Sequence, residues 1–326
     1  MTGARAALLW AIHRLLSAAP VVAGVTALTF LLIHLAPGDP IYLLAGDSGS
    51  AAYYAEMRAK YGLDRSLAEQ FLRYAGAIAR GDFGHSFMYQ RPVAGLLLDH
   101  LFASLLLGLT ALGLAAAGGF AAGVAAASTR SHMLDAVVRA GASLAYAAPV
   151  FWTGQMFVLA AAVWLGILPV SGMSGARVPL AGAAHAADVA WHLILPAITL
   201  SLPLGAVVAR ITRAAMIEAA REPFVRATYA RGLTRARVLV RHVAPHALIP
   251  VSTFIAQHAA QIVASAALTE ALFGWPGIGY LVLHATLHRD YPLVTTAFIF
   301  ISASVVVMNA AADAVTAWLD PRVRRA

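Results

Sequence analysis

Six stretches of mostly apolar sequence, each close to or above the length of a membrane-spanning helix, alternate with polar segments along this chain. A helix needs roughly 20 largely apolar residues to cross the hydrocarbon of a bilayer. With 60% hydrophobic and 12% charged residues over 326 positions, the chain is too apolar for one soluble core. We therefore predict an all-α integral membrane protein with six transmembrane helices. The predicted spans are Trp10–Leu35, Leu96–Ala127, Ala136–Gly166, Trp191–Ala209, Ala247–Leu272 and Leu293–Leu319.

The first span follows basic residues, as the apolar part of a signal peptide does, but it is too long for one. It also lacks a small-residue cleavage site, because Ala36–Pro40 follows it. We interpret it as a retained anchor. The predicted parts of the chain are then the N-terminus with the first span (1–35), a long first loop (36–95), a core with five further spans (96–319) and a tail (320–326).

Basic residues are unevenly distributed along the chain. Eight arginines fall between Arg210 and Pro250, in a polar interval flanked by two predicted spans. Because basic residues concentrate in cytoplasmic loops, this interval predicts a cytoplasmic loop of residues 210–250 and places both termini in the cytoplasm. The same topology accounts for the net charge of +8, so we expect no nucleic-acid partner. The first loop then lies outside the cytoplasm.

The first loop is long enough to contain structure of its own. Ala51–Tyr61 and Ser66–Arg80 are predicted to form short helices, broken at Gly62 and Gly81. Apolar residues recur at helical spacing in the second of them, so one of its faces is expected to lie against the membrane or a partner.

Glycine and proline mark features of the predicted core. Gly119 and Gly123 have the spacing of two small residues that lets helix backbones approach closely in lipid, which predicts an interior helix. Pro149, Pro196 and Pro203 fall in or near predicted spans and are expected to kink them.

The fifth predicted span is the most polar. Thr253, Gln257, Gln261 and Ser265 follow one another at intervals of four and therefore share one helix face, with His258 beside it. Polar side chains at membrane depth are costly unless they face a cavity or bond to another helix. We interpret the stripe as the lining of a translocation pathway, with contact between helices as the alternative.

The arginine-rich loop has the sequence of a helix, a tight turn and a second helix. Glu222 and Pro223 favour the start of a helix. Gly232 can adopt the left-handed backbone conformation that ends a helix, and Thr234 is suited to cap the next one. The alternative is an ordinary basic loop that contacts anionic lipid. The ordered positions of the acid, glycine and proline favour the first interpretation.

Several ordered motifs resemble those of one transporter family. Glu218-Ala219-Ala220, followed by Gly232 twelve residues after Ala220 and then by Ala247–Pro250, resembles the EAA loop of bacterial ABC importer permeases. The rest of the chain is similar to the "B" permeases of the dipeptide and oligopeptide branch. The motifs that carry this similarity are Phe30 with His34–Pro40, Tyr61–Arg65, Gly81–Ser86, Arg91–Val93, Glu270 with Phe273–Gly279, Arg289–Pro292 and Leu319–Arg322.

The resemblance implies that the loop contains a coupling helix that sits in a groove on a nucleotide-binding subunit. Arg231 stands where the family often has lysine, and His246 stands where it often has asparagine, so local geometry there is expected to differ. The residues expected to contact the ATPase subunit are Glu218, Ala219, Ala220, Glu222, Phe224, Tyr229, Arg231 and Gly232.

The resemblance also implies a bacterial inner-membrane complex that imports a solute by alternating access. Its other parts would be a second homologous permease subunit, two ATPase subunits that carry ATP and Mg, and an extracytoplasmic solute-binding protein. No cofactor is expected on this chain. Trp275, Arg289 and Asp290 are candidates for contact outside the cytoplasm. The implied cargo is a dipeptide or oligopeptide, with a nickel chelate or another small solute as the alternative.

Two other classes of function fit the sequence less well. An intramembrane hydrolase would show a His-Glu-x-x-His or Gly-x-Ser-x-Gly motif, and neither occurs. An ion-coupled secondary transporter would place acids deep in the spans, whereas Asp99, Glu270 and Asp313 lie towards span ends. There is no cysteine, and His284 with His288 forms at most an incomplete metal site, so we expect no metal.

Overall fold

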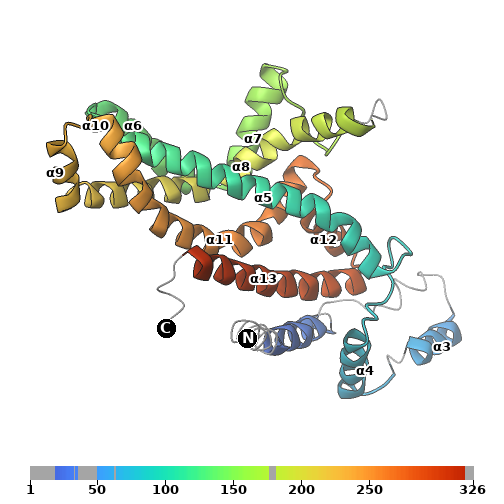
Figure 1. Cartoon of the computed structure of the whole chain (residues 1–326). Coiled ribbons are helices and arrows are strands. Elements are labelled where there is room, and N and C mark those ends of the chain that lie inside the picture. The colour runs from blue at the N-terminus through green and yellow to red at the C-terminus, as the bar shows by residue number, and fades with distance from the viewer. Residues whose placement is uncertain (1–18, 33, 36–49, 62–63, 176–180, 320–326) are drawn as a thin grey trace. The chain divides into compact units, whose positions relative to one another are not determined.

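The protein is known here from a computed structural model that describes residues 19–32, 34–35, 50–61, 64–175 and 181–319 (Figure 1). The described residues are helices joined by turns and loops, with one isolated antiparallel bridge between His85 and Pro92. The named helices are α3 (Ala51–Tyr61), α4 (Leu67–Ala79), α5 (Val93–Ser128), α6 (His132–Ala147), α7 (Val150–Phe157), η1 (Val158–Trp164), α8 (Gly182–Ala219), α9 (Pro223–Ala230), α10 (Arg235–Val238), η2 (Leu239–Val243), α11 (Ala244–Phe273), α12 (Ile278–Leu287) and α13 (Tyr291–Leu319).

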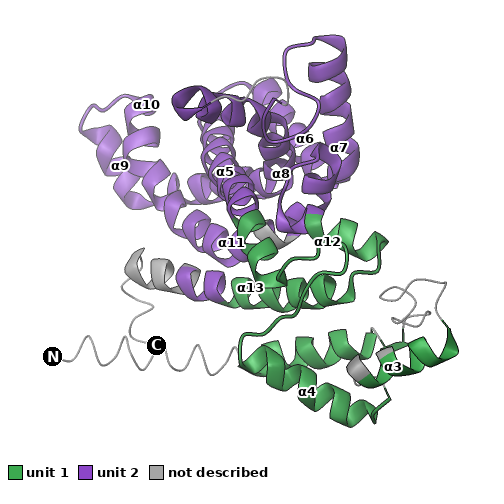
Figure 2. Ribbon diagram, turned by 90° about the vertical axis from the view of Figure 1, so that its right-hand side faces the viewer, with its two compact units in different colours: residues 1–101, 281–306 green, residues 102–280, 307–326 purple. Residues whose placement is uncertain are grey.

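Two compact units make up the chain (Figure 2). Unit 1 consists of residues 1–101 and 281–306, and unit 2 consists of residues 102–280 and 307–326. Because each unit is built from two separate stretches, α5, α12 and α13 contribute residues to both units.

The apolar helices confirm the predicted class of integral membrane protein. Within the described residues, four helices are long and apolar enough to cross a membrane, and two bent helix pairs raise the number to six if each pair is one span. The predicted first span lies partly outside the described residues, and the part that is described contains the shorter apolar helix Ala19–Leu32.

The predicted span over Ala136–Gly166 is a bent pair of helices, and the bend is sharper than the predicted kink. Two helical segments, His132–Ala147 and Val150–Trp164, meet there at 111°. The bend falls at Pro149, as expected for a residue that lacks an N–H and disfavours helix in the residue before it. By contrast, α8 continues through Pro196 and Pro203.

In unit 2, α5 and α8 approach closely at two glycines of α5. A side-chain carbon on Gly119 would collide with the carbonyl oxygen of Gly205 and with Val208. One on Gly123 would lie 2.5 Å from the Cβ of Thr212. The predicted small-residue contact is therefore confirmed, and it holds α5 against α8.

Gly119→Val is expected to lower the melting temperature of the purified chain, because the valine side chain forces the two helices apart. Overpacking of this kind costs about 1–3 kcal/mol. Gly118→Val is the matched control, because nothing lies within 4 Å of the position a side-chain carbon would occupy there. Equal melting temperatures for the two variants in detergent would contradict the contact.

Unit 1 contains the two short helices predicted in the first loop. α3 has the predicted bounds, and α4 runs between Ser66, whose hydroxyl accepts a bond from the N–H of Glu69, and Arg80. The predicted apolar face of α4 packs on the helix before the loop: the rings of Phe71 and Phe30 meet edge to face with centroids 5.4 Å apart. Burial in this contact region raises the pKa of Tyr74.

Candidate functional site

The loop of residues 210–250 folds into the predicted helix, tight turn and second helix. α9 begins at Pro223, directly after Glu222, whose backbone is extended (φ −65°, ψ 146°). Proline suits the first helical position because it needs no N–H partner there. Gly232 ends the segment with φ +80°, and its N–H bonds to the carbonyl of Tyr229 at 2.9 Å. Thr234 precedes α10, but its side chain makes no cap hydrogen bond, so that detail of the prediction is wrong.

α9 is fixed on an apolar base. Val225 is 2% exposed and packs in one cluster with Met216 of α8, Val238 of α10 and Val243 of η2. Thr228 is buried beside it, and its hydroxyl donates to the carbonyl of Val225 at 2.7 Å. Burying a side chain of valine size stabilises by roughly 1.5–3 kcal/mol, so these contacts hold α9 firmly against its neighbours.

Two aromatic side chains of α9 remain partly exposed, although each also borders a neighbouring element. Phe224 is 38% and Tyr229 is 41% exposed. Such partly exposed aromatic side chains on a rigid element are typical anchors of protein interfaces. Of the remaining residues predicted to contact a partner, Ala219 is buried and Ala220 is half-buried in the base, whereas Glu218, Glu222, Arg231 and Gly232 are exposed.

A direct contact joins α9 to the start of α11. The rings of Phe224 and His246 lie with centroids 4.9 Å apart and planes inclined by 40°. His246 is the position at which the sequence predicts a difference from the family. Its ring packs on Phe224 of α9. A shift of α9 would therefore displace the start of α11 through this contact.

A bidentate ion pair braces the end of α8 against α6. The Nε and Nη2 of Arg213 donate to the two carboxylate oxygens of Asp135 at 2.6 and 2.8 Å. Arg139, one turn along α6, also lies 3.3 Å from this carboxylate. Fork-to-fork pairs of arginine and carboxylate are stronger and more directional than single contacts, so this pair fixes the geometry of α6 and α8.

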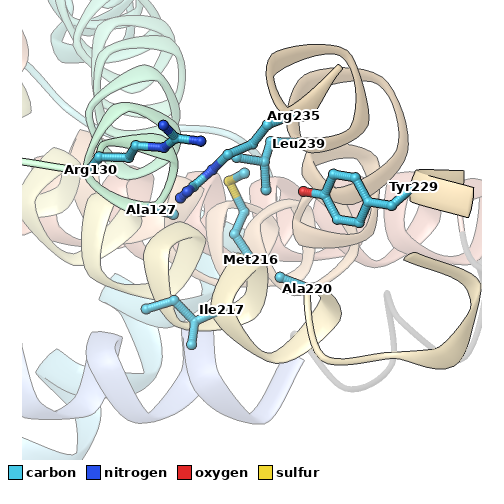
Figure 3. Close-up of a pocket in the computed structure, with 8 residues that line it drawn as sticks. All are labelled: Ala127, Arg130, Met216, Ile217, Ala220, Tyr229, Arg235 and Leu239. Atoms are coloured by element: carbon cyan, nitrogen blue, oxygen red, sulfur yellow. The ribbon is translucent and has the colours of Figure 1, made fainter. Parts of the chain in front are cut away.

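A cavity of about 450 Å³ lies between α9 and the ends of α5 and α8 (Figure 3). Its apolar lining includes Met216 and Ile217 of α8 and Ala220 directly after that helix. Arg130 and Arg235 extend into the same space in Figure 3, with the hydroxyl of Tyr229 opposite them. Tyr229 therefore belongs both to the partly exposed aromatic residues of α9 and to the lining of this basic hollow.

Sequence comparisons assign this architecture to a family. Residues 119–325 match the model of the "binding-protein-dependent transport system inner membrane component", and residues 7–108 match the corresponding N-terminal model. The chain belongs to this permease family. It is therefore a permease subunit of an ABC importer and a multi-pass inner-membrane protein, and ATP is hydrolysed by a separate ATPase subunit.

Among the relatives, the dipeptide transport system permease protein DppB of Escherichia coli K12 is 34% identical over 324 residues, which cover 94% of this chain and 95% of the relative. The di/tripeptide transport system permease protein DppB of Pseudomonas aeruginosa is 37% identical and covers the same shares. The glutathione transport system permease protein GsiC of Escherichia coli K12 is 32% identical, covering 97% of this chain and 98% of the relative.

Solved structures agree on the fold. The MetNI methionine ABC transporter, in a structure titled as inward facing, matches with a TM-score of 0.54 at 16% identity and covers 70% of this chain and 98% of its own. An amino acid ABC transporter matches with a TM-score of 0.50 at 15% identity, covering 70% of this chain and 94% of its own.

In this permease the predicted polar stripe lies on the outer surface of α11. Gln257, Gln261 and Ser265 are exposed and Thr253 is half-buried. The hydroxyl of Thr253 donates to the carbonyl of Ile249 at 3.1 Å, and that of Ser265 donates to the carbonyl of Ile262 at 3.1 Å. The two amide side chains are thus presented to whatever lies beside the permease, and their role in translocation stays a prediction.

Two of the three residues expected to make contacts outside the cytoplasm are buried. Trp275 is 0% exposed and donates its indole N–H to the carbonyl of Ala103 at 2.8 Å. Asp290 is 0% exposed and accepts hydrogen bonds from the hydroxyl of Ser86 and the N–H of Met88. Burial corrects the expectation of direct contact for both side chains. Arg289 is exposed with φ +56°, and its contact stays a prediction.

The sequence reasoning missed the role of Glu270. This carboxylate is 1% exposed and accepts hydrogen bonds from the hydroxyl of Ser104 at 2.6 Å and from the N–H groups of Gly279 and Tyr280 at 2.7 and 3.1 Å. Gly277 leaves the room that the carboxyl group occupies. An acid close to a glycine-rich stretch was the available signal, because free N–H groups at a helix start attract a carboxylate.

Proposed function

We propose that this permease imports dipeptides or oligopeptides. Two observations support this cargo: the similarity to permeases named for dipeptides, di/tripeptides and glutathione, and its extent over more than nine-tenths of both chains. The cargo class is proposed from the relatives, since no residue of the described pathway stripe selects a peptide by its chemistry.

The proposed complex contains a second homologous permease subunit, two ATPase subunits that bind ATP and Mg, and an extracytoplasmic solute-binding protein. In it, α9 is the coupling helix and occupies a groove of one ATPase subunit. The observation that carries this role is the combination of a buried base at Val225 with exposed rings at Phe224 and Tyr229. A rigid helix with an aromatic face can transmit force without deforming.

The proposed path of the motion runs from α9 into α11. Phe224 contacts His246 near the start of α11, and the polar stripe with Gln257 and Gln261 lies further along the same helix. Closing and separation of the ATP-bound subunits would then tilt α11 and open the pathway to opposite sides of the membrane in turn. In this proposal both termini and the loop of residues 210–250 lie in the cytoplasm.

Uptake by the assembled transporter in sealed vesicles tests the proposal. We expect a labelled dipeptide to accumulate only when ATP, Mg and the solute-binding protein are present, because the work comes from the ATPase subunits. Dissipating the proton and sodium gradients is expected to leave the initial rate unchanged. Uptake that follows an ion gradient, or uptake of a nickel chelate with exclusion of peptides, would contradict the proposal.

A further inference from the structure

The cavity behind α9 has the groups of an anion-binding site. Its polar lining consists of Arg130, Arg235 and Tyr229 over an apolar floor. A second hollow of about 330 Å³ shares Arg130 and Arg235 and is also lined by Ser128. Among the described residues, the hydroxyl oxygen of Ser128 is buried without a hydrogen-bond partner. Buried polar atoms without partners are rare in native proteins and often mark a missing ligand or water.

The two arginines lack an anionic partner in the part of the chain that the structure describes, where no carboxylate forms an ion pair with either. Elsewhere in the described residues, Arg91 pairs with Asp99 and Arg213 pairs with Asp135. Two guanidinium groups that enter one hollow repel each other, and the attraction of both to a shared anion would outweigh that repulsion.

The cavity has room for a molecule that carries a phosphate group, and its position gives access to such molecules. Its volume of about 450 Å³ is in the range of small-molecule sites. α5 has 36 and α8 has 38 residues, so each is about 55 Å long at 1.5 Å per residue. Because the hydrocarbon of a bilayer is only about 30 Å thick, the ends of these helices reach the polar zone where lipid phosphates and soluble anions are found.

We propose that this cavity binds a phosphate group between Arg130 and Arg235, carried by an acidic lipid or by a soluble phosphorylated compound. A phosphate has enough oxygens and charge to engage both guanidinium forks, and the hydroxyl of Tyr229 lies within the same lining. A bound phosphate joins the segment after α5 to the start of α10. It thereby fixes α10, which forms part of the apolar base under α9. Binding of the phosphate does not depend on the proposed coupling role of α9.

The binding test uses the full chain in nanodiscs of phosphatidylcholine, titrated with inorganic phosphate against chloride at equal ionic strength. We expect phosphate, and not chloride, to raise the melting temperature. The double variant Arg130→Gln with Arg235→Gln is expected to bind phosphate at least about tenfold more weakly, because it loses the charge-assisted bonds. Arg226 and Arg237 are exposed, as Arg130 and Arg235 are, but line neither hollow, so the double variant Arg226→Gln with Arg237→Gln removes the same charge and is expected to respond as the native chain does.

Two further arms identify the source of the phosphate. If it is a lipid, nanodiscs that contain phosphatidylglycerol will stabilise the native chain and the control, and added phosphate will have no further effect. If it is soluble, phosphate will act in both kinds of nanodisc.

Three outcomes would overturn the proposal. The first is no phosphate or phosphatidylglycerol response in the native chain, and the second is an equal response in the two double variants. The third is loss of both responses when the ATPase subunits are added to form the assembled transporter, because a carboxylate of that partner would then be the natural anion.

Discussion

Replacement of Glu270 by alanine is expected to prevent unit 2 from reaching its folded state. The change leaves the hydroxyl of Ser104 and two N–H groups in the first turn of α12 without their acceptor. Each buried donor that loses its partner costs about 1–3 kcal/mol, against a total stability of about 5–15 kcal/mol for a domain. The emptied space beside Gly277 and Gly279 adds a cavity penalty.

Glu270→Gln is the matched variant, because glutamine keeps the volume and one carbonyl oxygen for the N–H groups of α12. Ser104 can reorient its hydroxyl to accept from the new amide. We expect the glutamine variant to reach near-native levels in the membrane and the alanine variant to be degraded, as measured by the yield of monodisperse protein. Native yield and melting temperature for Glu270→Ala would show that the carboxylate does not organise this region.

The reason for so large an effect lies in the bend between two helical segments. Ser265–Phe273 and Ile278–Leu287 meet at 78°, and Gly274 turns the chain between them with φ +57°. The hydroxyl oxygen of Ser104 in α5 also accepts a hydrogen bond from the N–H of Ile278 at 2.8 Å. Glu270 and Ser104 therefore accept hydrogen bonds from the N–H groups in the first turn of α12, which have no partner within that helix. This makes the sharp bend possible in an apolar environment.

Features set by local sequence could be predicted. The runs that form α5, α8, α11 and α13 are visible because apolar composition is a local property. The short helix α9 and its glycine turn were also predictable, because Pro223 and Gly232 restrict the backbone at their own positions. The close contact at Gly119 followed from its spacing to Gly123.

Features set by partners distant in sequence could not be predicted. Glu270 meets Ser104, which lies 166 positions away, and Asp290 meets Ser86, which lies 204 positions away. No periodicity within one segment reveals such pairs, so Asp290 and Trp275 were mistaken for surface residues. The 111° bend at Pro149 was foreseen only as a kink, because its angle depends on how α7 packs against other helices.

Replacing Gly232 with valine is expected to uncouple ATP hydrolysis from import while leaving the permease folded. Gly232 has φ +80°, and nothing lies within 4 Å of a side-chain carbon placed there, so backbone strain rather than crowding is the cause. A residue with a side chain in the left-handed region costs roughly 1–2 kcal/mol, and a β-branched one is an outlier there. We expect the turn to relax this strain by shifting α10 relative to α9.

The shift matters because Val238 of α10 is part of the base on which α9 rests. A cost of one to two kcal/mol lowers the ratio of native to relaxed turn by about 5- to 30-fold, and ATP-dependent peptide uptake should fall by up to that factor. Gly232→Asn is the matched control, since asparagine tolerates left-handed backbone and is expected to retain most of the uptake. Uptake, ATPase rate and membrane yield are measured together: equal uptake in both variants would refute the role of this turn, and loss of yield in the valine variant would indicate a folding defect instead.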